Sequence, residues 1–247
     1  MSLSNRFASA AKALVPETLK RELRRSLPIP DTEACLSRMQ RNGFQPKLVI
    51  DVGAYVGDWT RMCRRVFPAA SILMIEPQAA TQDALLQIAA KDERIEVAHA
   101  LLGRRHDSQV PFYEAQSGSS VLTEWEREGQ QATATIDMTT LDALTADTTF
   151  AMPDLLKLDV QGYELEILKG AERALASAET VLMEVNFIDI HSGAPLFHEV
   201  VQFMAEHEFR LYDIGTFFRR PYDAALWQAD VVFVKFSSPL VSSKRWN

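Results

Sequence analysis

The 247-residue sequence has few of the residues that mark disulfide-rich, metal-binding or membrane-spanning proteins. Its two cysteines, Cys35 and Cys63, form no CxxC pair and have no histidine cluster beside them, so we expect reduced core thiols rather than disulfides or structural zinc. No apolar run approaches the roughly 20 residues that span a bilayer, and the N-terminus lacks the apolar stretch of a signal peptide. We therefore expect a cytoplasmic protein without a transmembrane segment.

The charge balance limits the partners that the protein can bind. Asp and Glu number 33 against 26 Lys and Arg, a formal charge of −7, which argues against a chain-wide surface for phosphate backbones and hence against nucleic acid. Residues 1–27 are the exception, with six basic and two acidic residues. This basic arm is either a peripheral membrane or partner contact or a solvated helical extension packed on the domain. Nothing in the sequence indicates the oligomeric state.

From residue 47 onward, short apolar runs typical of buried strands alternate with helix-like segments. Strands are predicted at 48–51, 71–75, 94–102, 155–159, 180–186, 209–214 and 230–236, and helices at 31–42, 58–67, after Pro77, 164–176 and 196–207. This rhythm predicts a doubly wound, mostly parallel α/β sheet over residues 47–247, preceded by an N-terminal helical extension over 1–46. Residues 103–137 interrupt this alternation, and we expect them to form an antiparallel excursion or lid beside the sheet. The last two strands are expected to form an antiparallel hairpin at its edge.

The turn after the first predicted strand carries the first candidate binding site. Asp51 precedes Gly53 and Gly57, which are four residues apart, unlike the GxGxxG pattern that binds a pyrophosphate. Glu76 ends the second strand, where an acid accepts hydrogen bonds from ribose hydroxyls in dinucleotide sites. These features fit S-adenosylmethionine, with its ribose at Glu76, its methionyl part at the glycine turn and its adenine near Ala100. The predicted cofactor-binding residues are Asp51, Gly53, Ala54, Tyr55, Gly57, Glu76, Ala100 and Leu101.

A series of motifs over residues 47–236 resembles one known family. In order along the chain these are LVIDVGAYVGDWT, ILMIEP, SGSS, TTLDAL, DLLKLDVQGYELEILKGAERAL, LMEVNF and DVVFV. They resemble the FkbM family of S-adenosylmethionine-dependent methyltransferases. The resemblance implies a class I (Rossmann-like) methyltransferase fold, a seven-stranded sheet with one antiparallel strand, and O-methylation of hydroxyl groups, often on sugars or secondary metabolites. The sequence departs from the family pattern at His99, near the expected adenine site, and at His191, after the fifth strand.

Candidate catalytic residues lie at the carboxyl ends of the later strands. Asp159 ends the fourth strand of the main sheet and is the first candidate for a general base or acceptor-orienting residue. Glu184 is a second candidate, or else a partner of Lys157, and His191 is a third candidate base. A divalent metal held by Asp159 with Glu184 or Asn186 is an alternative that we do not favour.

The predicted function is O-methylation of a small-molecule or glycan acceptor, with S-adenosylhomocysteine as the second product. Ser119 and Ser120, in the excursion, are candidates for the acceptor pocket. One alternative is an NAD-dependent sugar oxidoreductase or epimerase, although the sequence has neither GxGxxG nor a Tyr-x-x-x-Lys pair. Another is a binding module that keeps the sheet as a scaffold without catalysis.

Overall fold

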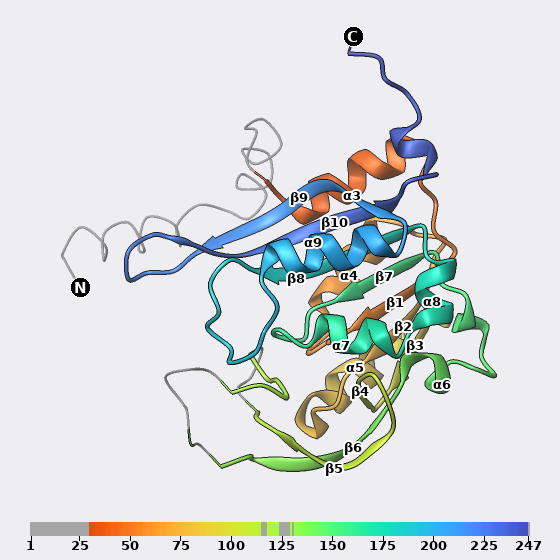
Figure 1. Cartoon of the computed structure of the whole chain (residues 1–247). Helices are drawn as coiled ribbons and strands as arrows, with labels where there is room; N and C mark the ends of the chain where they lie inside the picture. Colours follow the sequence, from red (N-terminus) through yellow and green to blue (C-terminus); the bar gives the residue numbers. More distant parts are fainter. Residues whose placement is uncertain (1–29, 115–117, 124–128, 130, 247) are drawn as a thin grey trace, which may run out of the picture.

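The computed structural model describes residues 30–114, 118–123, 129 and 131–246 (Figure 1). The basic arm of residues 1–27, with its predicted membrane or partner contact, lies outside these residues. Within the described ranges, no helix combines the length and the hydropathy of a membrane span.

A seven-stranded sheet forms the centre of the molecule, in the order β3-β2-β1-β7-β8-β10-β9. Its strands are β1 (Leu48–Val52), β2 (Ser71–Ile75), β3 (Ile95–Ala98), β7 (Leu155–Leu158), β8 (Thr180–Asn186), β9 (Phe209–Arg219) and β10 (Leu226–Lys235). The first five pair in parallel, and β10 runs antiparallel to both of its neighbours, β8 and β9. The prediction of a mostly parallel sheet with one antiparallel strand is confirmed.

Helices cover both faces of this sheet, because successive strand residues point to opposite faces and both faces are apolar. The α-helices are α3 (Thr32–Arg41), α4 (Asp58–Val66), α5 (Gln82–Ala89), α6 (Leu141–Leu144), α7 (Glu164–Lys169), α8 (Glu172–Ser177) and α9 (Phe197–Glu206). Short 3₁₀ helices span Ala79–Thr81, Thr149–Ala151 and Pro239–Val241. Figure 1 shows α7, α8 and α9 in front of the sheet, with α3 and α4 behind it.

The two faces have separate core clusters. Ile50, Leu156 and Val181 pack with α7, α8 and α9, whereas Val49 and Leu155 pack with α3 and α4. Both cysteines are free and fully buried in the second cluster, as predicted. Burial raises the pKa of the Cys35 thiol to about 12, with a smaller contribution from Asp213, so this thiol is protonated at neutral pH.

Helix α3 begins and ends as predicted. The Asp31 side chain accepts a hydrogen bond of 2.9 Å from the Ala34 N–H, which caps the helix, and Gly43 follows the last turn at a φ of +98°. Because α3 contributes Leu36 and Met39 to the second core cluster, it is packed directly on the sheet that begins at residue 48.

Two predicted elements are divided in the structure. The predicted strand 94–102 becomes β3 and a separate strand β4 (Leu101–Leu102), and β4 joins β5 (Asp107–Phe112) and β6 (Ala134–Thr139) in a second sheet of order β4-β6-β5. The predicted helix 164–176 becomes α7 and α8, which are separated at Gly170. A Cβ there would lie 2.2 Å from the Gly103 carbonyl oxygen, so this glycine admits a close backbone contact between the break and the segment after β4.

The antiparallel excursion and the edge hairpin are confirmed. Strands β5 and β6 pair antiparallel within residues 103–139, and β9 pairs antiparallel with β10. Both hairpin strands extend beyond the predicted ranges, to Arg219 in β9 and from Leu226 in β10. Most of the added β9 residues are exposed, so this part of the strand has no buried apolar pattern from which to predict it.

Candidate functional site

A cavity of about 280 Å³ opens at the carboxyl edge of β1, β2 and β7. In an open parallel sheet this edge is where ligands bind, because the connecting loops diverge there. Six of the eight predicted cofactor residues line the cavity: Gly53, Ala54, Tyr55, Glu76, Ala100 and Leu101. Of the predicted catalytic residues, Asp159 lines it, and the proposed acceptor residues Ser119 and Ser120 lie on its wall.

The turn after β1 requires glycine at Gly53. Its φ is +74°, and a Cβ at this position would lie 2.0 Å from the Asp159 carbonyl oxygen. The N–H groups of Gly53 and Ala54 both donate to the Ile75 carbonyl, at 3.0 and 3.2 Å, which holds the turn against the end of β2. Gly53 therefore lets the backbone of β1 approach β7 beside the cavity.

The second glycine of the motif has a different location. Gly57 caps the N-terminus of α4 at a φ of +79° and does not line the cavity. A Cβ on Gly57 would lie 2.3 Å from Ile88 Cδ1, so this glycine allows α4 to pack closely against α5. Its contribution to the site is to place the helix.

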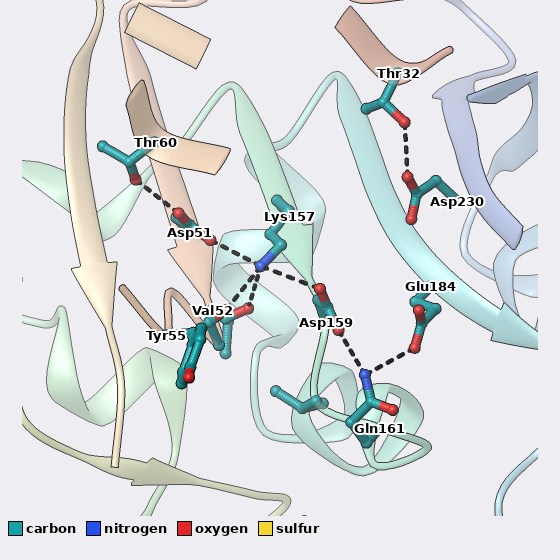
Figure 2. A network of polar contacts seen from close by, with 12 residues as sticks. Thr32, Asp51, Val52, Tyr55, Thr60, Lys157, Asp159, Gln161, Glu184 and Asp230 are labelled. Atoms are coloured by element: carbon teal, nitrogen blue, oxygen red, sulfur yellow. Dashed lines mark hydrogen bonds and ion pairs between the residues drawn. The ribbon is translucent and has the colours of Figure 1, made fainter. Parts of the chain in front are cut away.

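Asp51 lies behind the cavity wall rather than on it. Its fully buried carboxylate accepts a 2.6 Å hydrogen bond from Thr60 Oγ1 and pairs with Lys157 Nζ at 3.0 Å (Figure 2). The same ammonium group donates to the Gly53 carbonyl at 2.8 Å and to the Val52 carbonyl at 3.3 Å. Asp51 thus supports the turn through Lys157, whereas the sequence had suggested that it lies beside the ligand.

Lys157 also lines the cavity, although the sequence did not single it out as a site residue. Burial by itself lowers the pKa of Lys157, but the Asp51 and Asp159 carboxylates outweigh burial, so the pKa lies above its ordinary value and the group is charged. The expected alternative pair between Lys157 and Glu184 is not formed. A signal for the observed pair existed, because Asp51 and Lys157 are direct neighbours once β1 and β7 are aligned at their carboxyl ends.

Glu76 is buried in the cavity wall with its carboxylate held by the backbone. Its two oxygens accept hydrogen bonds from the Tyr55 N–H at 2.8 Å and the Gln78 N–H at 3.0 Å. Tyr55 has a φ of +48°, a left-handed conformation that accompanies this contact. Burial raises the pKa of Glu76, although the two backbone hydrogen bonds oppose the increase. The Gln78 side chain also hydrogen-bonds this carboxylate, so about one of its roughly four lone-pair sites stays open to a hydroxyl donor.

Asp159 is more exposed than Glu76, another acidic residue on the cavity wall. Its side chain is 40% exposed and lies 3.8 Å from Lys157 Nζ. Gln161 Nε2 donates to Asp159 Oδ1 at 3.0 Å, so one oxygen faces an amide and the other a cation (Figure 2). The carboxylate is therefore oriented and still open to an incoming hydroxyl group.

The other two predicted catalytic residues do not line the cavity. Glu184 accepts hydrogen bonds from Gln161 Nε2 at 2.9 Å and Gln228 Nε2 at 2.8 Å. Burial, with the nearby carboxylates of Asp159 and Glu164, raises the pKa of Glu184 well above its ordinary value. His191, the third candidate base, is only 3% exposed.

Gln161 and Gln228 were not predicted as site residues. Glutamine is uncharged and gives no signal in the charge pattern, and the contacts of Gln228 join residues far apart in the chain. Among the residues that the structure describes, no group of three or more His, Cys, Asp or Glu side chains is arranged to hold a metal ion. Asn186, considered as a metal ligand, accepts a hydrogen bond from Gln228 at 3.1 Å.

Comparison with known proteins agrees with this architecture. The family described as Methyltransferase FkbM domain matches residues 51–211. A solved structure of the methyltransferase FkbM from Methylobacillus flagellatus KT has a TM-score of 0.51 and 18% identity, over 76% of this chain and 43% of that one. This chain thus corresponds to less than half of that protein's length. The comparison with curated proteins gave no match.

Two further solved structures have lower scores. Precorrin-6y C5,15-methyltransferase from Geobacter metallireducens GS-15 has a TM-score of 0.47 and 14% identity, over 82% of this chain and 86% of that one. Magnesium protoporphyrin IX methyltransferase from Synechocystis PCC 6803, solved with bound S-adenosylmethionine, has a TM-score of 0.44 and 11% identity, over 82% and 76%. Since the family match extends over more than half of the sequence, the chain belongs to the FkbM family of S-adenosylmethionine-dependent methyltransferases.

Proposed function

We propose that this enzyme transfers a methyl group to a hydroxyl group of a sugar, glycan or secondary metabolite. The observation that carries the proposal is one cavity with two carboxylates of different character on its wall. Glu76 is buried and held by backbone N–H groups, whereas Asp159 is 40% exposed and oriented by side chains. The first suits a ribose, and the second suits an acceptor hydroxyl group.

The residues around Glu76 fit the donor. A buried carboxylate with a lone pair left over can accept a hydrogen bond from a ribose hydroxyl. Ala100 and Leu101 add apolar surface on the same wall, where we place the adenine, and the Gly53–Tyr55 turn offers close backbone approach for the methionyl part. Asp51 and Gly57 act from behind this wall, by holding the turn and placing α4.

The chemistry of the acceptor side follows from Asp159. When bound, S-adenosylmethionine supplies an electrophilic methyl group. A neutral hydroxyl is a weak nucleophile, so a carboxylate within hydrogen-bond reach assists by orienting it and accepting its proton. Asp159 has this role in our proposal, and Lys157, 3.8 Å away, stabilises its charge. Phe112, Val121 and Tyr163 line the same cavity and help to exclude water.

The acidic composition of the chain supports a small-molecule or glycan acceptor rather than nucleic acid. The two unpaired, buried cysteines are compatible with the cytoplasm that we propose as the location. Our proposal includes no metal, and it gives His191 no direct role because this residue does not line the cavity.

The donor site is tested by calorimetry with S-adenosylhomocysteine. Glu76→Ala removes a charge-assisted hydrogen bond to the ribose, so we expect affinity to fall roughly 10- to 100-fold. Because the Tyr55 and Gln78 N–H groups lose their acceptor too, the unfolding free energy also falls, by about 2 kcal/mol, and binding is compared at a temperature where the variant is folded. Glu96→Ala is the matched control, because Glu96 is an exposed carboxylate on β3 outside the cavity. Unchanged affinity in Glu76→Ala, or tighter binding of NADH than of S-adenosylhomocysteine by the unaltered protein, contradicts the assignment.

The acceptor is sought with methyl-labelled S-adenosylmethionine and a panel of sugars, glycans and hydroxylated metabolites, with and without a chelator. With any acceptor found, Asp159→Asn lowers kcat by about 100-fold and leaves donor affinity within about threefold. Equal losses of turnover and donor affinity place Asp159 in the donor site instead. Methylation restricted to nitrogen or carbon acceptors refutes O-methylation.

A further inference from the structure

The turn after β7 is held in an unusual backbone conformation. Gln161 and Gly162 are consecutive residues in the left-handed region, with φ of +56° and +98°. A non-glycine residue there costs about 1 kcal/mol or more and persists only where its surroundings impose it. Glu164 Oε1 accepts from the Val160 and Gly162 N–H groups at 3.0 and 3.2 Å, and Ser120 Oγ donates to the Gln161 carbonyl at 3.1 Å. The turn is therefore tied to the helix after it and to the excursion.

The consequence of this conformation is the direction of the Gln161 side chain. Its single amide nitrogen donates to Asp159 Oδ1 at 3.0 Å and to Glu184 Oε1 at 2.9 Å (Figure 2). A side-chain amide has two N–H bonds, and both are used here. Gln161 thus bridges a carboxylate on the cavity wall to a buried one on the neighbouring strand.

The buried end of the bridge is itself fixed. Glu184 Oε1 also accepts from Gln228 Nε2 at 2.8 Å, and Gln228 donates in turn to Asn186 at 3.1 Å. Gln228 is 4% exposed and lies on β10, so this second amide belongs to the sheet core. Gln161 and Gln228 therefore present the same group to the same oxygen of Glu184, but Gln161 alone of the two also contacts Asp159.

We infer that Gln161 is a positioning residue for methyl transfer, which holds the Asp159 carboxylate in the orientation that receives the acceptor hydroxyl group. The inference rests on the proposed role of Asp159. One oxygen of Asp159 is held by Gln161 and the other faces Lys157, so loss of the amide leaves the exposed carboxylate restrained on one side only.

The test needs no acceptor, because it observes Asp159 directly. The Cγ resonance of Asp159, assigned with Asp159→Asn, is followed by carbon-13 NMR over a pH titration with S-adenosylhomocysteine present. Gln161→Met keeps the side-chain volume and removes one donor to the ionised carboxylate, so the titration midpoint moves to higher pH by about 0.5 to 1. The charged residues around Asp159, which are Lys157, Glu164, Glu184 and Asp230, are all retained in this variant. Glu184 also loses the Gln161 donor, and the control variant matches that loss by removing its Gln228 donor.

Gln228→Met is the matched control, because it removes an equal amide from Glu184 without touching Asp159. We expect its midpoint to stay within about 0.2 of the unaltered protein. Equal shifts in both variants, or no shift in Gln161→Met, overturn the inference. If Gln161→Met does not fold, Gln161→Asn replaces it, because asparagine tolerates the left-handed conformation and its shorter side chain no longer spans both carboxylates. A midpoint that does not move in this variant again overturns the inference.

Once an acceptor is found, kinetics separate this inference from the proposed function. Gln161→Met lowers kcat about tenfold with little change in the KM for S-adenosylmethionine, because only the orientation of the base is affected. If Asp159→Asn retains full turnover, the proposed role of Asp159 fails. If Asp159→Asn is impaired and Gln161→Met is not, the positioning role alone fails.

Discussion

The two halves of the cavity, which we propose bind the methyl donor and the acceptor, are built in different ways. On the donor side, most of the hydrogen bonds that fix the site come from the backbone. Two N–H groups hold Glu76, and the N–H groups of the Gly53 turn donate to the Ile75 carbonyl. On the acceptor side, side chains hold one another, as in the bridge from Asp159 through Gln161 to Glu184.

This difference has a physical consequence for substitution. Backbone donors are present whatever the side chain, so the donor half depends on chain geometry and on a few positions such as Gly53. Side-chain bridges can be altered one residue at a time without moving the backbone. In our proposal the donor half therefore suits one fixed ligand, whereas the acceptor half can be adapted to another ligand by single substitutions. Lys157 belongs to both halves, because it contacts Asp51, the Gly53 carbonyl and Asp159.

The largest effect is expected where the halves meet. Lys157→Met leaves the fully buried Asp51 carboxylate without its cation, which costs about 4 kcal/mol of unfolding free energy, measured by denaturant titration. Lys169→Met is the control, since Lys169 pairs with Glu166 at the surface and such pairs contribute about 1 kcal/mol or less. Similar losses in the two variants are incompatible with a buried junction between the halves.

A smaller effect is expected from the donor turn alone. In Gly53→Ala the new Cβ clashes with the Asp159 carbonyl, and alanine is also strained in the left-handed conformation of this residue. We expect the unfolding free energy to fall by about 3 kcal/mol and the binding of S-adenosylhomocysteine to weaken. Gly43→Ala separates these causes, because Gly43 has a φ of +98° but open space around its Cβ position. It should lose only about 1 kcal/mol and bind normally. An equal loss at both glycines means that backbone strain, not close approach, explains Gly53.

The smallest effect concerns the turn on the acceptor side. Burial raises the pKa of Glu164 from an ordinary 4.5 to about 7. Between these values the folded state holds a proton that the unfolded state has lost, so stability falls as pH rises through this window, by about 1.5 kcal/mol between pH 5.5 and 7.

Glu164→Gln keeps an oxygen for the Val160 and Gly162 N–H groups and does not titrate, so the stability of this variant loses that component of its pH dependence. Denaturant titrations at several pH values measure the difference. Glu166→Gln, on the same helix but partly exposed, keeps the wild-type slope. A slope unchanged by Glu164→Gln shows that Glu164 is ionised in the folded protein throughout this range.

Much of the fold follows from local pattern. The strands at 71–75 and 180–186 were predicted with their observed bounds, because each is a short run rich in apolar residues between two helix-like segments. The break between β3 and β4 was missed, since apolar residues occur on both sides of it and the pairing of Leu101 with Met138 depends on a strand far along the chain.

The location of the candidate site could be predicted from the sequence, but the contacts of its side chains could not. Strand ends that carry Asp51, Glu76 and Asp159 indicated the edge of the sheet at which the cavity opens, and most of the predicted cofactor residues line this cavity. The direction of each side chain was harder to predict. Asp51 pairs with Lys157, and Glu184 accepts hydrogen bonds from two glutamines, and these partners come close only because of the order of the strands in the sheet.

The sequence by itself determined the alternation of strands and helices, the edge at which they place their polar residues, and the family to which the chain belongs. These depend on local hydrophobic period and on motif residues, which are local properties of the chain. Only the tertiary structure decided which carboxylates face the cavity and which are buried behind it. That choice depends on charge pairs and amide bridges between strands, whose free energy exists only after the sheet has brought distant residues together.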